Sequence, residues 1–559
     1  MNTRTAFLLL LLIFPSPANG QRWTLPDSVR EQVDDVFSFV ERDAPGCALG
    51  VVQDGKLAYG RGYGLANLDW GVPLTTSTVF DIGSVSKQFT ATAMALLDLD
   101  GILSLDDPVK KWVPELPDYG PVITIRHLLN HTSGVRDYLT LMNLAGFDFA
   151  NVFDEFDGVE IITRQKALNF EPGSEFLYSN SGYLLLANIV RRATGKSLRE
   201  SLEERVFGPL GMSGSSIWDD NTEILRERAT GYAPSDGGWA IEHAWNFQMG
   251  GDGQVITSVE DLLKWDRNFY HPVVGGQGLL DHLHTRGVLN DGDTIAYALG
   301  LSVGEYRGLR NVQHGGSWAG FRAMLSRFPE HHTSVITLCN RGDANPGALT
   351  SRVVDAVLAS ELSERLGEGR EPEEEEGVGE SDSPVSLSAA QLRRWVGLYR
   401  RAERPDYIRL EVSEGRLAVR QGEDTYPLSP RSESVFVLEL NGQRLTFSTE
   451  NGRDRVQSGS TVFQRVDSPD LSLADLGGYR GRYYSEELDA TFELRLDSDR
   501  LWLHRPGGDS TVVYPGAADE FEAGGLGLTF VRDGGGITGL SIFAGRVTGI
   551  VFEREGGSP

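Results

Sequence analysis

An acidic stretch beyond the middle of the chain limits most strongly what this sequence can fold into. Residues 367–384 carry seven Glu, one Asp and one Arg, a net charge of −7, with two prolines and no aromatic side chain. Such a segment buries too little apolar surface to offset the cost of ordering it, and its charges repel one another. It therefore predicts a linker between two folded parts, with few contacts crossing it.

The part before the linker has the pattern of mixed α and β structure. Residues 46–63 alternate around an Asp-Gly turn, which is typical of a hairpin. Apolar residues recur at helical spacing after Ser84 and again over 183–193, and residues 311–340 alternate as three strands separated by turns. We expect an α+β domain over residues 21–366.

The part after the linker is rich in strand-forming residues and contains a weak internal repeat, with an offset of 83 to 89 residues. We expect two small antiparallel β domains, 385–467 and 468–559, for which a lipocalin-like barrel is one option. The matching pairs are Gly397 and Tyr399 with Gly481 and Tyr483, Arg416-Leu417 with Arg500-Leu501, Leu445-Thr446-Phe447 with Leu528-Thr529-Phe530, and Val462-Phe463 with Val551-Phe552.

Charge and targeting signals narrow the function. The net charge of −27 argues against a nucleic-acid partner, whose binding surface is basic. Residues 1–20 combine Arg4, a short apolar run and small residues near position 20, as in a secretory signal peptide. We expect an exported protein, periplasmic or secreted, without a membrane span; an uncleaved anchor is the alternative.

Three short motifs carry residue types that do chemistry. Ser84 and Lys87 share one face of a helix start, where a base can activate the hydroxyl and backbone N–H groups can bind an oxyanion. Tyr178 precedes Asn180 by two positions, and a phenol beside a cation can act as a base. The third motif runs from His314 through Ser317. Each has a plain structural alternative: a surface lysine, a buried tyrosine before a helix cap, and a glycine turn.

The order and spacing of these motifs resemble the serine β-lactamase and penicillin-binding protein superfamily. The closest resemblance is to the class C β-lactamase branch with its esterase and D-amino-acid peptidase relatives. The resemblance covers about residues 25–360, and four further segments carry it: 80–84, 125–134, 170–173 and 253–258. It implies a β-lactamase/transpeptidase-like fold, an antiparallel sheet flanked by helices with a helical subdomain, followed here by the all-β region.

The resemblance also implies roles for individual residues. Ser84 is the expected nucleophile, Lys87 and Tyr178 move its proton, and Asn180 orients Lys87 and the substrate. The backbone N–H groups of Ser84 and Ser317 form the expected oxyanion hole. No metal and no cofactor is implied.

The third motif departs from the superfamily pattern, and His314, Gly316 and Ser317 are its expected substrate-binding residues. Relatives that act on β-lactams or cell-wall peptides begin this motif with a lysine, which attracts a substrate carboxylate. A histidine is mostly neutral at pH 7. We therefore expect an ester or a (D-)aminoacyl amide or peptide as substrate. A β-lactamase, a D-Ala-D-Ala carboxypeptidase and an inactive peptide- or cell-wall-binding relative remain alternatives.

Three smaller expectations concern residues outside these motifs. His127 and His131 have the spacing of metal ligands on a helix, although no third ligand is evident. Four phenylalanines between positions 147 and 156 either line the cleft or anchor a loop. In the implied fold Cys47 and Cys339 lie on neighbouring strands; a disulfide is possible there, and two unpaired thiols are favoured because bridging needs tight register.

Overall fold

The computed structural model describes residues 24–242, 246–362, 384–402, 404–440, 442–459, 461–508 and 510–556. The expected signal peptide and, apart from Pro384, the acidic linker lie outside the described residues.

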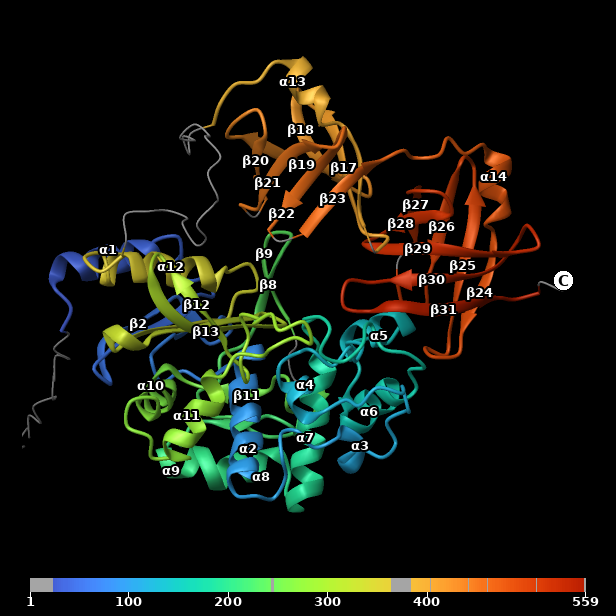
Figure 1. Cartoon of the computed structure of the whole chain (residues 1–559). Helices are drawn as coiled ribbons and strands as arrows, with labels where there is room; N and C mark the ends of the chain where they lie inside the picture. Colours follow the sequence, from blue (N-terminus) through green and yellow to red (C-terminus); the bar gives the residue numbers. More distant parts are fainter. Residues whose placement is uncertain are drawn as a thin grey trace, which may run out of the picture.

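A six-stranded antiparallel sheet forms the centre of the first part of the chain (Figure 1). Its strand order is β12-β13-β14-β15-β1-β2, so the expected first hairpin, β1 and β2, pairs with the last strand β15. The strands are β1 Cys47–Gln53, β2 Lys56–Tyr63, β12 Ser302–Tyr306, β13 Leu309–Trp318, β14 Phe321–Phe328 and β15 Thr333–Cys339.

Cys47 and Cys339 form a disulfide between β1 and β15. The expectation that these thiols are neighbours is confirmed, but the preference for unpaired thiols is wrong. The register pairs Cys47 directly with Cys339, and their Cα atoms are 4.0 Å apart. The bond therefore joins the two ends of the first part, 292 residues apart in sequence.

Helices cover both faces of the sheet, because strand β1 is apolar on both of its faces. Cys47, Leu49 and Val51 pack against helices α1 (Asp27–Val36) and α12 (Pro346–Val357). Ala48 and Val52 belong instead to the larger core on the opposite face, which includes helices α2 and α10. The bounds on that side are α2 Lys87–Leu99, α10 Val259–Asn268 and α11 Gly276–His284.

A helical subdomain is built around α7 (Asn180–Thr194), which is buried from Asn180 through Val190 and ends at Gly195, a left-handed residue with φ 74°. It lies against α2, so the Ser84 motif and the Tyr178 motif meet where sheet and helices join. The other helices of this group are α3 Val109–Trp112, α4 Ile125–Leu129, α5 Tyr138–Ala145 and α6 Glu155–Thr163. No helix of the described segments has the length and apolar character needed to span a membrane.

The C-terminal region forms two closed eight-stranded barrels, β16–β23 and β24–β31, and the expectation of an all-β tail is confirmed. A short helix precedes each barrel, α13 (Ala389–Arg394) and α14 (Leu473–Gly478). The first barrel comprises β16 Gly397–Arg401, β17 Tyr407–Ser413, β18 Arg416–Gln421, β19 Asp424–Pro430, β20 Val435–Leu438, β21 Arg444–Glu450, β22 Arg453–Ser458 and β23 Thr461–Val466. The second comprises β24 Gly481–Ser485, β25 Ala490–Asp497, β26 Arg500–His504, β27 Thr511–Pro515, β28 Glu520–Ala523, β29 Leu526–Asp533, β30 Gly536–Phe543 and β31 Thr548–Arg554.

The sequence repeat corresponds to this duplication. Each matching pair falls on strands with the same place in the two barrels: first, third, sixth and eighth. Tyr399 and Tyr483 make the same hydrogen bond, each donating its hydroxyl to the carbonyl four residues before it, at 3.1 and 2.9 Å.

The second barrel packs against the helical subdomain, contrary to the few contacts expected across the linker (Figure 1). Arg136 pairs with Glu487 at 2.6 Å, and their side chains are 1% and 5% exposed. Arg136 also donates to the carbonyls of Thr548 and Gly549 at 3.0 Å. Together these buried contacts make the second barrel part of the folded unit rather than a loose appendage.

Candidate active site

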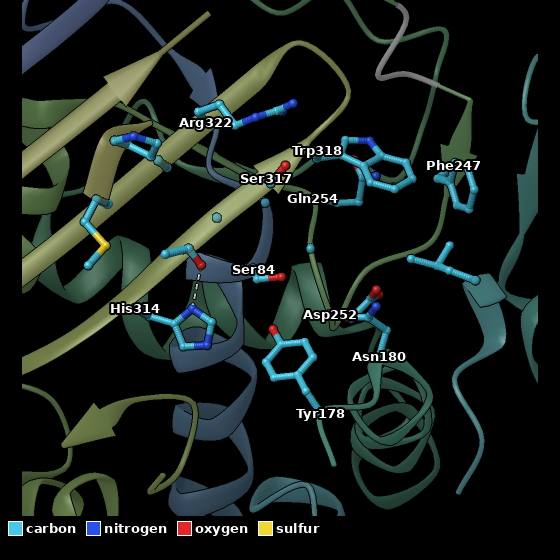
Figure 2. A pocket seen from close by; sticks show the side chains of 18 of the residues that line it. Ser84, Tyr178, Asn180, Phe247, Asp252, Gln254, His314, Ser317, Trp318 and Arg322 are labelled. Atoms are coloured by element: carbon cyan, nitrogen blue, oxygen red, sulfur yellow. Dashed lines mark hydrogen bonds between the residues drawn. The ribbon is translucent and has the colours of Figure 1, made fainter. Parts of the chain in front are cut away.

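Ser84 lies in a short 3-10 turn, η1 (Gly83–Ser86), which continues directly into α2. The turn begins at Gly83 with φ 49°, a conformation that glycine adopts without strain. Figure 2 shows Ser84 at the floor of a cleft between β13 and the helical subdomain. The cleft has a volume of about 700 Å³ and is lined by Ser84, Tyr178, Asn180, His314, Gly316 and Ser317.

Lys87 lies fully buried beside Ser84 and makes three contacts through its Nζ atom. The distances are 3.1 Å to Ser84 Oγ, 2.9 Å to Asn180 Oδ1 and 2.6 Å to the Asp252 carbonyl oxygen. Because carbonyl oxygens only accept, Asn180 and Asp252 each take one N–H of Lys87. The remaining position on Nζ faces Ser84 and can hold or release one proton.

Tyr178 points its hydroxyl toward Ser84 in Figure 2. Its oxygen is buried and has no hydrogen-bond partner among the described residues. Lys87 Nζ lies 4.9 Å from the centre of the ring, and the His131 ring packs against it at a tilt of 33°, with ring centres 4.1 Å apart. The hydroxyl is therefore free to exchange a proton with Ser84 or with a bound substrate.

His127 and His131 both have structural partners. His131 Nδ1 accepts a hydrogen bond from the Ser179 N–H at 3.2 Å, which fixes the segment that carries Tyr178. His127 accepts the Thr124 N–H at 3.3 Å and completes the cap of α4. Within the described segments no group of three or more His, Cys, Asp or Glu side chains is arranged to hold a metal ion.

The edge of β13 faces the nucleophile because β12 pairs with it only as far as Gln313. A Cβ on Gly316 would lie 1.9 Å from the Ile82 carbonyl oxygen and 3.2 Å from Ser84 N, so only glycine allows this approach. On the other side of this contact, a Cβ on Gly83 would lie 2.7 Å from Ser317 N. The segments that carry the N–H groups of Ser84 and Ser317 are thus in close contact, as the expected oxyanion hole requires.

His314 is buried and neutral at pH 7. Burial, and then the charge of Lys87, lower its pKa to about 4. Its Nδ1 lies 2.6 Å from the Gly315 carbonyl and its Nε2 lies 3.0 Å from the Tyr297 hydroxyl, an arrangement that suits a neutral ring with the proton on Nδ1. The third motif therefore brings no positive charge to the cleft.

Sequence reasoning missed several residues that line the cleft. Asp252 is buried, and burial raises the pKa of its carboxyl. The Tyr138 hydroxyl lies 3.2 Å from one carboxylate oxygen of Asp252 and 3.5 Å from the other. Phe247 and Trp318 contact each other edge to face, with ring centres 4.7 Å apart. Asp252 lies between two glycines and directly before residues 253–258, which carry the family resemblance, and these were the signals in the sequence that pointed to this acid.

The expected phenylalanine cluster mainly anchors a loop. Phe147, Phe149 and Phe153 contact one another or Phe247, with ring centres 5.5 to 6.1 Å apart. Phe149 also lines a second groove next to the cleft, whereas Phe156 is 71% exposed.

The second barrel contributes to the cleft as well. The turn between β30 and β31 and the start of β31, residues 544–549, reach the cleft mouth, and we name this segment the cleft hairpin. At its tip the Arg546 guanidinium lies over the Tyr178 ring, 4.9 Å from the ring centre. No sequence motif marked this arginine.

Comparisons with known proteins agree with this geometry. A family model described as Beta-lactamase matches residues 27–359. The chain is similar to the D-aminopeptidase of Brucella anthropi, with 29% identity over 536 residues, 91% of this chain and 95% of that protein. It is also similar to the D-aminopeptidase of Cereibacter sphaeroides, with 27% identity over 528 residues, 89% of this chain and 93% of that protein.

Among solved structures, the octameric penicillin-binding protein homologue from Pyrococcus abyssi aligns with a TM-score of 0.55 and 22% identity. The alignment covers 78% of this chain and 99% of that one. At this identity the likeness supports the fold.

Proposed function

Because the chain belongs to the β-lactamase family and is a serine hydrolase, we propose that it cleaves the amide bond on the carbonyl side of a D-amino acid through an acyl-enzyme on Ser84. The observation that carries the proposal is the placement of Lys87 Nζ between Ser84 Oγ and Asn180 Oδ1, with the Tyr178 hydroxyl unpartnered beside them. The D-amino-acid specificity rests on the two D-aminopeptidases that match over about nine-tenths of the chain.

Acylation follows from these contacts. Ser84 Oγ attacks the substrate carbonyl and gives its proton to the Lys87–Tyr178 pair. The oxyanion that forms accepts hydrogen bonds from the N–H groups of Ser84 and Ser317. The pair then delivers the proton to the departing nitrogen, the carbon–nitrogen bond breaks, and an ester of the D-aminoacyl group with Ser84 remains.

Deacylation repeats the sequence with water. The same pair takes a proton from water, the resulting hydroxide equivalent attacks the ester, and Ser84 Oγ recovers a proton as it leaves. Asn180 accepts one N–H of Lys87, which holds Nζ beside Ser84 Oγ.

Hydrolysis of D- and L-alanine p-nitroanilide by the wild type and by Ser84→Ala tests the proposal. We expect the D enantiomer to be preferred and Ser84→Ala to lose several orders of magnitude in turnover. Intact mass after a fluorophosphonate probe should show one adduct that is absent in Ser84→Ala and retained in Ser38→Ala, an exposed serine control. An adduct that persists in Ser84→Ala would overturn the nucleophile, and a preference for the L enantiomer would overturn the substrate class.

We also propose that the protein is exported. Residues 1–20 have the composition of a signal peptide, and a disulfide such as Cys47–Cys339 is typical of an oxidising compartment. N-terminal sequencing of protein from a fractionated culture should start near Gln21 in an extracytoplasmic fraction. Recovery of intact protein from the cytosol alone would contradict export.

A further inference from the structure

Arg546 lies where two hollows of the surface meet. The cleft around Ser84 and the second groove share Leu139, Trp318 and Arg546 in their linings. A substrate that extends from Ser84 into the groove therefore passes the guanidinium. The Arg546 side chain is 46% exposed, which leaves room for contact with a ligand.

The cleft hairpin presents this arginine on a fixed backbone. The Asn169 side chain donates to the Arg546 carbonyl at 2.9 Å and accepts the Thr548 N–H at 2.7 Å. Ala544 and Val547 bond to each other across the turn. The backbone on both sides of Arg546 is thus hydrogen-bonded to the first part of the chain, which carries Ser84 and which we call the catalytic part. The guanidinium is therefore held at the cleft mouth.

The guanidinium has donor capacity left over. It donates no hydrogen bond to any residue that the structure describes, and its contact with Asp137 is long, at 4.0 Å. Asp137 is already engaged, because it accepts the N–H groups of Asn180 and Thr140 and the Thr140 hydroxyl. Guanidinium and carboxylate match as bidentate partners, so a carboxylate entering the cleft meets an available one here.

The third motif brings no charge, since His314 is neutral where the wider superfamily has a lysine. Arg322 also lines the cleft, but its guanidinium donates to the carbonyls of Ala319 and Phe321 at 2.6 and 2.7 Å. We propose that Arg546, supplied by the second barrel, binds a carboxylate of the substrate, so that the preferred substrates are D-aminoacyl amides that carry a carboxylate. The inference rests on the proposed function and names its substrate class. It adds to the neutral third motif a positive charge that comes from another domain.

Two matched substrate pairs test this inference and locate the carboxylate. D-Glutamyl and D-glutaminyl p-nitroanilide differ by a carboxylate on the acyl part. D-Alanylglycine and D-alanylglycinamide differ by one on the leaving part. We expect the wild type to prefer the carboxylate member of at least one pair by about tenfold or more in kcat/KM, as a charge-assisted hydrogen bond provides.

The preference should depend on Arg546. Arg546→Gln should bring the kcat/KM ratio of the responding pair close to one, and Arg546→Lys should keep part of it. Arg482→Gln is the control, because Arg482 is an exposed arginine of the same barrel that pairs with Glu555. A wild type without preference in either pair, or a preference that survives Arg546→Gln, would overturn the inference.

The same compounds separate this inference from the proposed function. Each is also measured as a competitive inhibitor of p-nitrophenyl acetate hydrolysis, which reports acylation of Ser84 without amide cleavage. If no amide is cleaved but the inhibition constants favour the carboxylates in an Arg546-dependent way, the proposed function fails and the inference stands. Equal inhibition constants within both pairs would overturn it.

Discussion

The two C-terminal barrels have the same topology but different relations to the catalytic part. Both close eight antiparallel strands and follow a short capped helix. The first barrel contacts the catalytic part through the ion pair Arg404–Glu175, whose carboxylate side chain is 43% exposed. The second buries Arg136–Glu487 and extends the cleft hairpin to the Tyr178 ring.

This difference shows that the repeated strands carry the fold, and that the loops decide what each copy does. The β22–β23 turn of the first barrel, around Gly459, holds the place of the cleft hairpin. Among the described residues it lines neither the cleft nor the second groove. One copy thus serves as scaffold, while the other completes the site.

Removal of the second barrel should have the largest effect. A chain that ends at residue 467 leaves Arg136 without its carboxylate and without two carbonyl acceptors, in a position that is otherwise buried. We expect this protein to be poorly soluble and to lack hydrolase activity, as judged by gel filtration and p-nitrophenyl acetate hydrolysis. A soluble product with wild-type activity would show that the second barrel is dispensable and would contradict the contrast between the two barrels.

The loss of unfolding free energy when one ion pair is broken should differ between the two barrels. Glu487→Gln should lower the free energy of unfolding by about 3–5 kcal/mol, because it leaves the buried Arg136 charge unpaired. Glu175→Gln removes a partner that is 43% exposed from Arg404, which is 10% exposed, and should cost less, about 1–2 kcal/mol. Urea unfolding of the full chain measures both, and equal losses would contradict the contrast.

The two equivalent turns can be loosened by one residue each. Asn169→Ala removes both side-chain hydrogen bonds that hold the cleft hairpin, whereas Gln457→Ala removes the bond to the Gly459 carbonyl in the first barrel. We expect Asn169→Ala to raise KM and thereby lower kcat/KM roughly tenfold. The reason is that Arg546 would no longer be held in place, and a small displacement of a binding group is costly. Steady-state kinetics should show no change for Gln457→Ala; similar losses in both would mean that the effect is not specific to the cleft.

The sequence predicted the parts of the site that are local in the chain. Ser84 and Lys87 lie within one helical turn, and Tyr178 and Asn180 adjoin the start of α7. Their spacing in the sequence therefore fixes their spacing in the structure. The duplicated barrels could also be predicted, because strand residues such as Tyr399 and Tyr483 recur at one offset.

The rest depends on register and on contacts between distant segments. The Cys47–Cys339 bond needs two strands in one particular register. Arg136 meets Glu487 across 351 positions, and Arg546 reaches Tyr178 from a turn whose sequence resembles many others. The acidic linker suggested independence, but a linker sets only how far apart two parts can move, and the surfaces that they bury decide whether they do.

The smallest expected effect on stability comes from a tyrosine hydrogen bond that the two barrels share. Tyr399 and Tyr483 each donate a buried hydroxyl to the carbonyl four residues earlier, and burial raises the pKa of both to about 12. Both therefore remain protonated donors at physiological pH.

Replacing either tyrosine by Phe leaves one buried carbonyl without this donor and should cost about 1 kcal/mol of unfolding free energy. The two losses should agree within about 0.5 kcal/mol, and together they should add, because the sites share no partner. Urea unfolding of the two single variants and the double variant measures this. A larger loss for Tyr483→Phe would mean that docking against the catalytic part, and not the barrel alone, depends on this hydrogen bond.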